Sequence, residues 1–189
     1  RAEEPTLRFA EVMQGLGSKL GPCFIQLPDH HGPAELQLVR DFLRLWPADH
    51  RLHWELRHPD WFGEGPPQAV HGFDALESAG HGTVITDVAG RRDVLHMQLT
   101  TPVLMLRFVG NGLHPTDYAR ADAWIQKIAD WAGRGLQEAY LFIHQPDMPQ
   151  VPPFAGYWAK ALNQALGLQA DTQIHIPQPI PTVIQGSLF

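Results

Sequence analysis

Five short apolar segments recur along the chain, alternating with segments of helical periodicity. The apolar segments cover residues 23–27, 52–56, 82–86, 103–108 and 139–143. Segments this short and this continuously apolar are typical of parallel strands, which are covered on both faces. Between and after them, apolar side chains recur every three or four residues over 6–16, 33–45, 67–79, 116–132 and 153–166. This alternation predicts an α/β fold with a parallel sheet.

The composition supports one globular unit and excludes several classes of protein. Of the 189 residues, 44% are apolar and 18% are charged, a balance typical of a folded domain. The net charge of −6 argues against binding nucleic acid or an anionic membrane by charge alone, although a local basic patch remains open. No segment approaches about 18 consecutive apolar residues, so no membrane association is expected. The single cysteine, Cys23, excludes an internal disulfide, and a cytoplasmic location is predicted.

Charged side chains follow the ends of the predicted strands. In parallel α/β folds, ligands bind at the carboxyl ends of the strands. Because side chains alternate along a strand, Glu55 and Arg57 share one face of the second strand. If the faces that carry Asp87 and Arg107 on the next two strands also point into a barrel, all four side chains converge at its mouth.

Two carboxylates and two guanidiniums at one site predict the binding and conversion of an anion. Arg57 and Arg107 would hold a carboxylate or phosphate group through paired hydrogen bonds. Glu55 and Asp87 would act as catalytic acid and base, or would hold a divalent metal ion together with His144. No HxH or HExxH pattern supports the metal. The alternative is a structural salt-bridge network in which buried charges neutralise each other.

Other polar and aromatic residues near the strand ends are assigned to substrate binding: Gln26, His58, Trp61 and His144. The ring of Trp61 would stack on a sugar or a base, or alternatively pack its own loop. After the third strand, the loop carries Arg91, Arg92 and Asp93. These residues would clamp a phosphate group or pair with each other inside the loop.

Two segments resemble a known family. Residues 19–28 read KLGPCFIQLP, and residues 54–62 read WELRHPDWF. Together they resemble the YecE-like family, number 72 among the domains of unknown function. The strand ends at Asp87 and Arg107 and the segment around Trp124 are also similar to that family. The resemblance covers about residues 7–167, and the two segments are specific.

The resemblance implies a TIM-like (β/α) barrel, of which this chain carries about the last five βα units. The family's GTSGW-like first strand and its NSTFY-like segment are not found in the sequence. We therefore predict a partial barrel domain over residues 1–170 and an extended arm over residues 171–189. Seven site positions are carried over from the family's motifs: Gln26, Glu55, Arg57, His58, Trp61, Asp87 and Arg107. The resemblance implies no established activity.

The last five residues, 185–189, read QGSLF. They resemble the bacterial sliding-clamp-binding peptide, whose pattern is Q-L-[SD]-L-F, with Gly186 at the usual Leu position. Gln185 would make polar contacts with the clamp, and Leu188 and Phe189 would enter an apolar cleft. The alternative is a terminal segment that packs its own Leu and Phe on the barrel.

Two classes of function remain open at this point. In the first, the barrel is an enzyme that acts on a phosphorylated or nucleic-acid-related substrate and is recruited to the DNA sliding clamp, which would place it in DNA repair. In the second, it is a non-catalytic accessory or small-metabolite-binding barrel whose strand-end charges are structural. The predicted partners are the clamp and an anionic small molecule or nucleic acid. A divalent metal is the one cofactor considered.

Overall fold

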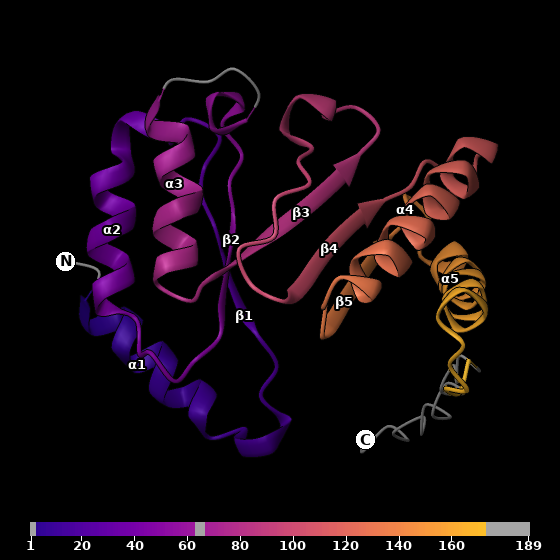
Figure 1. Cartoon of the computed structure of the whole chain (residues 1–189), viewed down its shortest axis with the longest axis horizontal. Helices are drawn as coiled ribbons and strands as arrows, with labels where there is room; N and C mark the ends of the chain where they lie inside the picture. The colour runs from indigo at the N-terminus through magenta and orange to yellow at the C-terminus, as the bar shows by residue number, and fades with distance from the viewer. Residues whose placement is uncertain (1–2, 63–66, 173–189) are drawn as a thin grey trace, which may run out of the picture.

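Five parallel strands form one sheet in the computed structural model, which describes residues 3–62 and 67–172. The strands lie side by side in sequence order, from β1 to β5. Their bounds are β1 Cys23–Gln26, β2 Leu52–Glu55, β3 Gly82–Val88, β4 Val103–Val109 and β5 Glu138–His144. The predicted α/β fold and its five strands are therefore confirmed (Figure 1).

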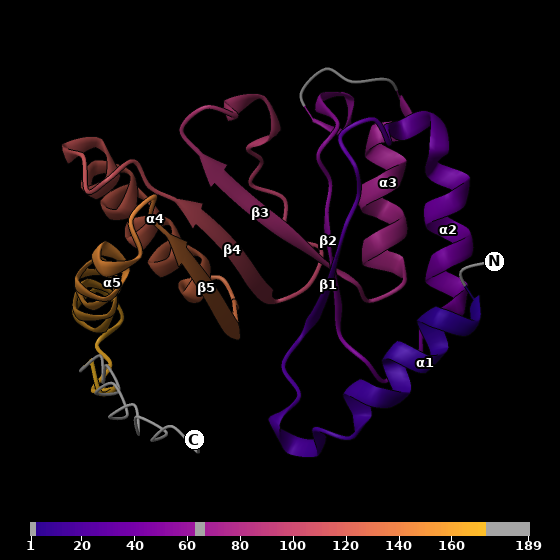
Figure 2. The ribbon, with the colours of Figure 1, turned by 180° about the vertical axis from the view of Figure 1, so that it is seen from behind.

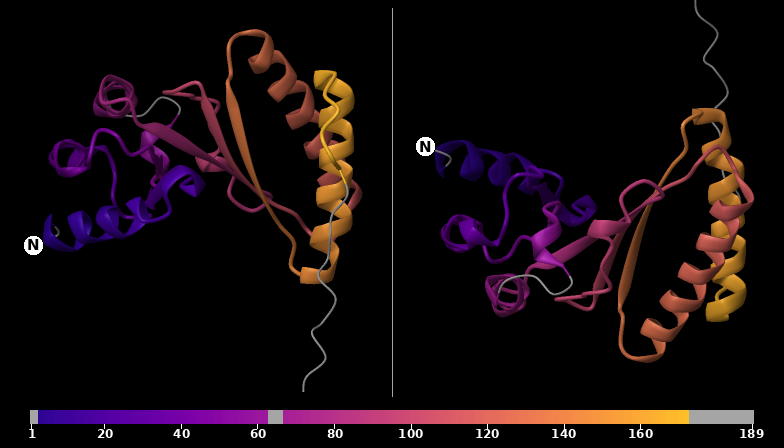
Figure 3. Two further views of the ribbon diagram at one scale, coloured as in Figure 1. Left: turned by 90° about the horizontal axis from the view of Figure 1, so that it is seen from below. Right: turned by 90° about the horizontal axis from the view of Figure 1, so that it is seen from above.

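Five α-helices accompany the strands within the described residues, at or near the segments of helical periodicity. They are α1 Glu3–Gln14, α2 Leu36–Leu45, α3 Pro67–Ser78, α4 Pro115–Gly133 and α5 Val151–Leu166. α1 to α3 flank the β1 and β2 half of the sheet, and α4 and α5 flank the other half (Figures 1 and 2). Seen from below and from above, the two groups of helices stand at opposite ends of the sheet (Figure 3).

Local sequence explains where the longest helix begins. The His114 ring accepts a hydrogen bond from the Thr116 backbone N–H at 3.3 Å, which satisfies a donor in the first turn of α4. Pro115 occupies the first turn, where its missing N–H costs no hydrogen bond. At the end of α5, Gly167 adopts a left-handed conformation with φ of 63°, which a side chain would disfavour.

Each half of the sheet has its own apolar core. On the β2 side, Trp54 packs edge-on against Phe42 of α2, with ring centroids 5.4 Å apart. On the β4 side, Phe108 packs against Phe154 and Trp158 of α5. All of these side chains except Phe42 are almost completely buried. Their burial against helices stabilises each half through the apolar area removed from water.

The strand register assigns every strand side chain to one of two faces. In β3 and β4, Ile85 lies opposite Leu106 and Asp87 lies opposite Phe108, and these side chains face the helices. We call this side the helix face. Side chains at alternating positions, including Arg107, point to the other side, which we call the open face.

The open face carries partly exposed aromatic side chains. Phe24 of β1 is 49% exposed and Phe142 of β5 is 44% exposed. Near the start of β2, Arg51 Nη1 bonds Glu138 Oε1 of β5 at 2.6 Å, although β3 and β4 lie between these strands. The sheet therefore curls toward its open face.

A closed barrel is not observed. Among the described residues, β1 pairs only with β2 and β5 pairs only with β4, so the sheet is open. The physical reason is that five strands do not span the circumference of a TIM barrel, which needs eight. The barrel thus remains an implication of the resemblance, whereas the parallel sheet with its helices is established. The predicted arm lies outside the described residues from position 173 onward.

Two irregularities interrupt the regular βα alternation. β3 and β4 are joined by residues 89–102, which form the short 3-10 helix η4 (Arg92–Val94) and no α-helix. β2 and β3 pair only through His53 with Gly82 and Trp54 with Thr83.

Within residues 3–62 and 67–172, no helix is both long enough and apolar enough to cross a membrane.

Candidate functional site

A buried carboxylate lies on the open face at the carboxyl ends of the strands. Glu55 ends β2 and is 2% exposed. Its Oε2 forms an ion pair with Arg107 Nη1 of β4. The same Nη1 donates to Gln26 Oε1 at the end of β1, at 3.2 Å. Glu55 and Arg107 therefore meet, as their predicted convergence requires, and the predicted substrate-binding residue Gln26 joins them from a third strand.

Most of the hydrogen-bonding capacity of this cluster is unused. Within the described part of the chain, contacts engage only Oε2 of Glu55 and Nη1 of Arg107. The Arg107 side chain is 27% exposed, and its guanidinium lies 6.0 Å from the ring centroid of Phe24. A guanidinium with free N–H groups beside a solvent-accessible aromatic ring is a suitable site for a planar anion.

The site residues assigned from the sequence do not include one residue of this face, Thr86, although it lies at the end of the predicted third strand. It lies opposite Arg107 in the register of β3 and β4 and therefore shares the open face. Its Oγ1 is buried and has no hydrogen-bond partner among the described residues. A buried hydroxyl without a partner costs free energy, so Thr86 is a candidate to bond a ligand. The alternation of side chains along a strand could have found it. Thr86 directly precedes Asp87, so the two side chains must point to opposite faces of β3.

Asp87 does not join Glu55, and the predicted convergence of the two carboxylates is wrong. Asp87 points to the helix face, where its Oδ1 accepts from Arg92 Nη1 at 2.5 Å and Arg120 Nη1 at 2.8 Å. Its Oδ2 accepts from Trp124 Nε1 at 2.7 Å. The physical reason is the register of β3, because a shift by one residue moves a side chain to the opposite face.

The network around Asp87 extends into α4 and the loop before it. Arg120 Nη2 donates to Asp117 Oδ1 at 2.9 Å and to the Val109 carbonyl at 2.9 Å. Asp117 Oδ2 accepts from the Asn111 backbone N–H at 2.7 Å. Both carboxylates are almost completely buried and bonded through both oxygens. This matches the alternative we kept open, a structural network that joins a strand end to a helix.

The remaining predicted substrate-binding residues have different surroundings. Arg57 is half-buried, and its guanidinium makes no hydrogen bond or ion pair with residues 3–62 and 67–172. His58 Nδ1 accepts from the Asp60 backbone N–H at 3.1 Å, which caps η3 (Pro59–Trp61). His144 is exposed at the end of β5, on the open face.

Trp61 is a core residue. It is 2% exposed, and its Nε1 donates to the His31 carbonyl at 2.9 Å. A Cβ placed on Gly72 of α3 would lie 2.4 Å from its ring, so helix and indole are in direct contact. The predicted stacking on a substrate is therefore not supported, and the alternative, packing of its own loop, is what the structure contains.

A metal site built from the predicted residues does not fit the geometry. Glu55 and Asp87 lie on opposite faces of the sheet and cannot ligate one ion together with His144. The described segments contain no group of three His, Cys, Asp or Glu side chains placed to hold a metal.

Several histidines are buried, and burial keeps them neutral. Desolvation lowers the pKa of His53 to about 4, and neither ring nitrogen makes a hydrogen bond of acceptable geometry. Desolvation also lowers the pKa of His96 to about 4, against the opposing effect of its hydrogen bond to the Val84 carbonyl at 3.2 Å. The pKa of His81 is lowered for the same reason.

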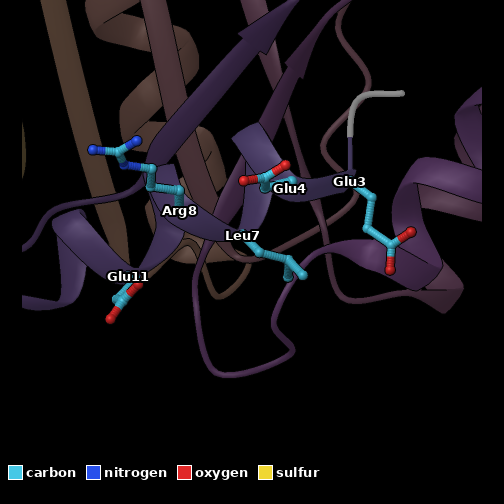
Figure 4. A pocket seen from close by; sticks show the side chains of 5 residues that line it. All are labelled: Glu3, Glu4, Leu7, Arg8 and Glu11. Carbon is cyan, nitrogen blue, oxygen red and sulfur yellow. The ribbon is translucent and has the colours of Figure 1, made fainter.

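A hollow of about 710 Å³ on the surface of α1 is not a site. Glu3, Glu4, Leu7, Arg8 and Glu11 line it, and all of them belong to α1. Figure 4 shows that the Arg8 and Glu11 side chains point in opposite directions rather than toward a common centre. Side chains of a single exposed helix with divergent orientation do not enclose a ligand.

Comparison with known proteins identifies the family. A family model described as "Protein of unknown function DUF72" matches residues 1–180. The chain belongs to the DUF72 family. The resemblance inferred from residues 19–28 and 54–62 is thereby confirmed.

Two curated DUF72 relatives are described as "UPF0759 protein YecE", one from Escherichia coli K12 and one from Escherichia coli O157:H7. Each is 30% identical to this chain over 161 residues, which cover 76% of this chain. The chain spans 58% of the length of these relatives. This description states no activity.

Solved structures of DUF72 proteins share the fold. A protein from Enterococcus faecalis matches with a TM-score of 0.63 at 18% identity, covering 89% of this chain and 70% of that one. A protein from Thermotoga maritima matches with a TM-score of 0.54 at 17% identity, covering 76% of this chain and 58% of that one. At these identities the likeness extends to the fold alone.

Proposed function

We propose that this DUF72 protein binds and converts an anionic small molecule, phosphorylated or related to nucleic acid, at the open face. One observation carries the proposal: a buried carboxylate, Glu55, is held by a guanidinium whose other N–H groups are unused. Arg107 would bind the anion, and Gln26 orients Arg107 through the 3.2 Å hydrogen bond. Arg57 would add a second positive charge.

In this proposal Glu55 is the acid–base group. A carboxylate beside an anion-binding guanidinium is placed to take a proton from a hydroxyl of the bound molecule and return it later. Thr86 Oγ1, which has no described partner, would donate a hydrogen bond to the same molecule. Asp87 receives no catalytic role, because three donors already occupy its oxygens.

The alternative is a binding protein in which Glu55 and Arg107 only neutralise each other. The enzyme and the binding protein differ in how a conservative substitution of Glu55 affects turnover. Glu55→Gln keeps the shape and a hydrogen bond to Arg107 but removes the proton-accepting group. Glu77→Gln, on the exposed surface of α3, is the matched control.

The test combines binding and turnover with named probes. A sugar phosphate, para-nitrophenyl phosphate and a 5′-phosphorylated DNA oligonucleotide are titrated calorimetrically, and products are followed by mass spectrometry. We expect Arg107→Gln to abolish binding, and Glu55→Gln to bind but lose turnover by about 100-fold or more, the scale of general acid–base catalysis. Binding without turnover in the unaltered protein selects the alternative. Unchanged binding in Arg107→Gln overturns the proposal.

We further propose that the chain is recruited to the DNA sliding clamp through residues 185–189. The support is the sequence QGSLF, in which Gln185, Leu188 and Phe189 match the clamp-binding pattern; these residues lie outside the described part of the chain. Surface plasmon resonance on the clamp of the same organism is the test. Micromolar binding that is lost in a Leu188→Ala, Phe189→Ala variant is expected. Absence of binding by the intact chain overturns this part of the proposal.

A further inference from the structure

A cavity lies on the helix face, where the helical layer is interrupted. β3 and β4 are connected by residues 89–102 without an α-helix, and this connection stands beside β3 between α3 and α4 (Figure 1). A cavity of about 320 Å³ lies between this connection and α4. Asp87 belongs to its lining and points away from Glu55, so the sheet separates this cavity from the open-face site.

The charged side chains that line the cavity are predominantly cationic. Arg92 comes from the connection, and Arg120 and Lys127 come from α4. The only carboxylate among the lining residues is Asp87, and its two oxygens already accept from Arg92, Arg120 and Trp124. A cation would therefore meet three positive charges and no free acceptor, whereas an anion would meet favourable charge.

Each cation keeps hydrogen-bonding capacity that no described contact uses. Arg92 is 53% exposed and bonds through Nη1 alone. The Nε of Arg120 is buried and has no partner in the described segments. Lys127 Nζ forms an ion pair with Asp130 Oδ2 at 3.9 Å, but this separation is beyond hydrogen-bonding distance, so its N–H groups remain unused among the described residues. These are the donors that an oxyanion accepts from.

The rest of the lining is apolar. Leu95 and Met97 from the connection face Ala123 and Trp124 of α4 across the cavity, and Met97 is 47% exposed. A volume of 320 Å³ is at the lower end of the range of about 300–1,000 Å³ found for small-molecule sites. An exposed methionine beside an indole is suited to contact with an aromatic ring. The lining thus fits a compact aromatic group that carries an anion.

We propose that this cavity binds a compact aromatic phosphate ester, with the phosphate group between Arg92 and Lys127 and the ring against Met97 and Trp124. The proposal goes beyond the function of the open face and does not depend on it. It also gives a role to the basic loop after β3. Arg91 pairs with Asp93 inside the loop, at 3.1 Å, whereas Arg92 is directed to the cavity.

The test is a calorimetric titration with phenyl phosphate. It is performed in an Arg107→Gln background, so that the open-face site does not contribute to the measured heat. We expect saturable binding that Lys127→Glu weakens by about tenfold or more, because it reverses a charge at the phosphate. Arg134→Glu makes the same charge change on the exposed end of α4 and should alter the affinity less than about twofold, as rim charges do.

Two further measurements separate the parts of the proposed ligand. Ala123→Phe fills the cavity from the exposed side of α4 without changing a charge, and it should abolish binding of phenyl phosphate while inorganic phosphate still binds weakly. Phenol, which lacks the phosphate, should not bind. No binding of phenyl phosphate up to 10 mM, or equal effects of Lys127→Glu and Arg134→Glu, overturns the proposal, with about 10 mM as the limit of meaningful affinity.

Discussion

Glu55 and Asp87 are both carboxylates at the carboxyl ends of neighbouring strands, and both are almost completely buried, yet their surroundings differ. Glu55, on the open face, meets one guanidinium that remains 27% exposed. Asp87, on the helix face, accepts from three donors on two structural elements. The comparison teaches that burial alone does not separate a reactive carboxylate from a structural one. The number of lone pairs that already accept hydrogen bonds separates the two, because a carboxylate whose lone pairs are all occupied has none left for a ligand.

The largest expected effect is the loss of the Asp87 network. Asp87→Ala leaves Nη1 of Arg120 and the Trp124 N–H without their acceptor in a buried site. Removing one partner of a buried ion pair costs about 3–5 kcal/mol, so the free energy of unfolding should fall by that amount in urea denaturation. Asp93→Ala, an exposed carboxylate on the same connection, is the control and should change stability by less than about 1 kcal/mol. Equal effects of the two changes would contradict a structural role for Asp87.

A second expectation is that the folded protein loses stability in acid, because two histidines are buried, one on each side of the sheet. His53 shares the open face with Glu55, whereas His96 stacks on Phe62. Burial lowers both pKa values from 6.5 to about 4 in the folded protein. The unfolded chain therefore binds protons more readily below pH 6.5, and folding must lose stability as the pH falls from 6.5 toward 4, while it is unaffected above that range.

Each histidine should contribute about 3 kcal/mol to this loss, because one pKa unit corresponds to 1.36 kcal/mol. The measurement is the urea midpoint at a series of pH values. His96→Phe, which keeps an aromatic ring in the stack, should flatten the dependence by about half. A midpoint that stays constant between pH 6.5 and 4.5 would show that these rings are not held neutral.

A smaller loss of stability is expected at Glu55. Glu55→Gln retains an acceptor for Arg107 but removes the charge, and exchanging a charged hydrogen bond for a neutral one costs about 1 kcal/mol. The informative quantity is the difference between the losses of unfolding free energy in Glu55→Gln and Asp87→Ala. Both variants are therefore measured in the same series of denaturation curves. A loss of more than about 3 kcal/mol at Glu55 would place it among the structural carboxylates.

The smallest expected effect is at Thr86. Thr86→Val removes a buried hydroxyl that has no described partner, so stability should remain unchanged or rise by about 1 kcal/mol. If Thr86 bonds a ligand, the same change weakens binding at the open face while the protein becomes no less stable. Thr83→Val is the matched control on β3, because its hydroxyl donates to the Gln98 carbonyl, so its removal should be destabilising. A clear destabilisation by Thr86→Val would indicate a partner for this hydroxyl.

The sequence predicted the elements better than their faces. Apolar runs and helical spacing located all five strands, because burial of strands and helices leaves a local pattern. The face of Asp87 could not be predicted in this way. β3 is buried on both sides over most of its length, so its sequence does not alternate, and its orientation depends on pairing with β2 and β4.

Long-range contacts account for the remaining errors. The donors to Asp87 from α4, Arg120 and Trp124, are 33 and 37 residues away in the sequence. Trp61 was assigned to a substrate because it belongs to the second family motif, but its burial depends on Gly72 of α3. By contrast, Glu55 and Arg107 of the predicted convergent group do meet, and Gln26 joins them, since each lies at or near the end of its own strand on the open face. Site residues set by strand position were thus predictable, and those set by partners from other elements were not.

The short pairing between β2 and β3 has a consequence for cooperativity. His53–Gly82 and Trp54–Thr83 are the whole ladder between the two halves of the sheet, and each half has a separate apolar core. A pairing between two strands with so few backbone hydrogen bonds offers little resistance to local unfolding. In native-state hydrogen exchange, amides of β1 and β2 should therefore form one cooperative block and those of β4 and β5 another. The chain would then lose its structure as two foldons joined at one narrow ladder.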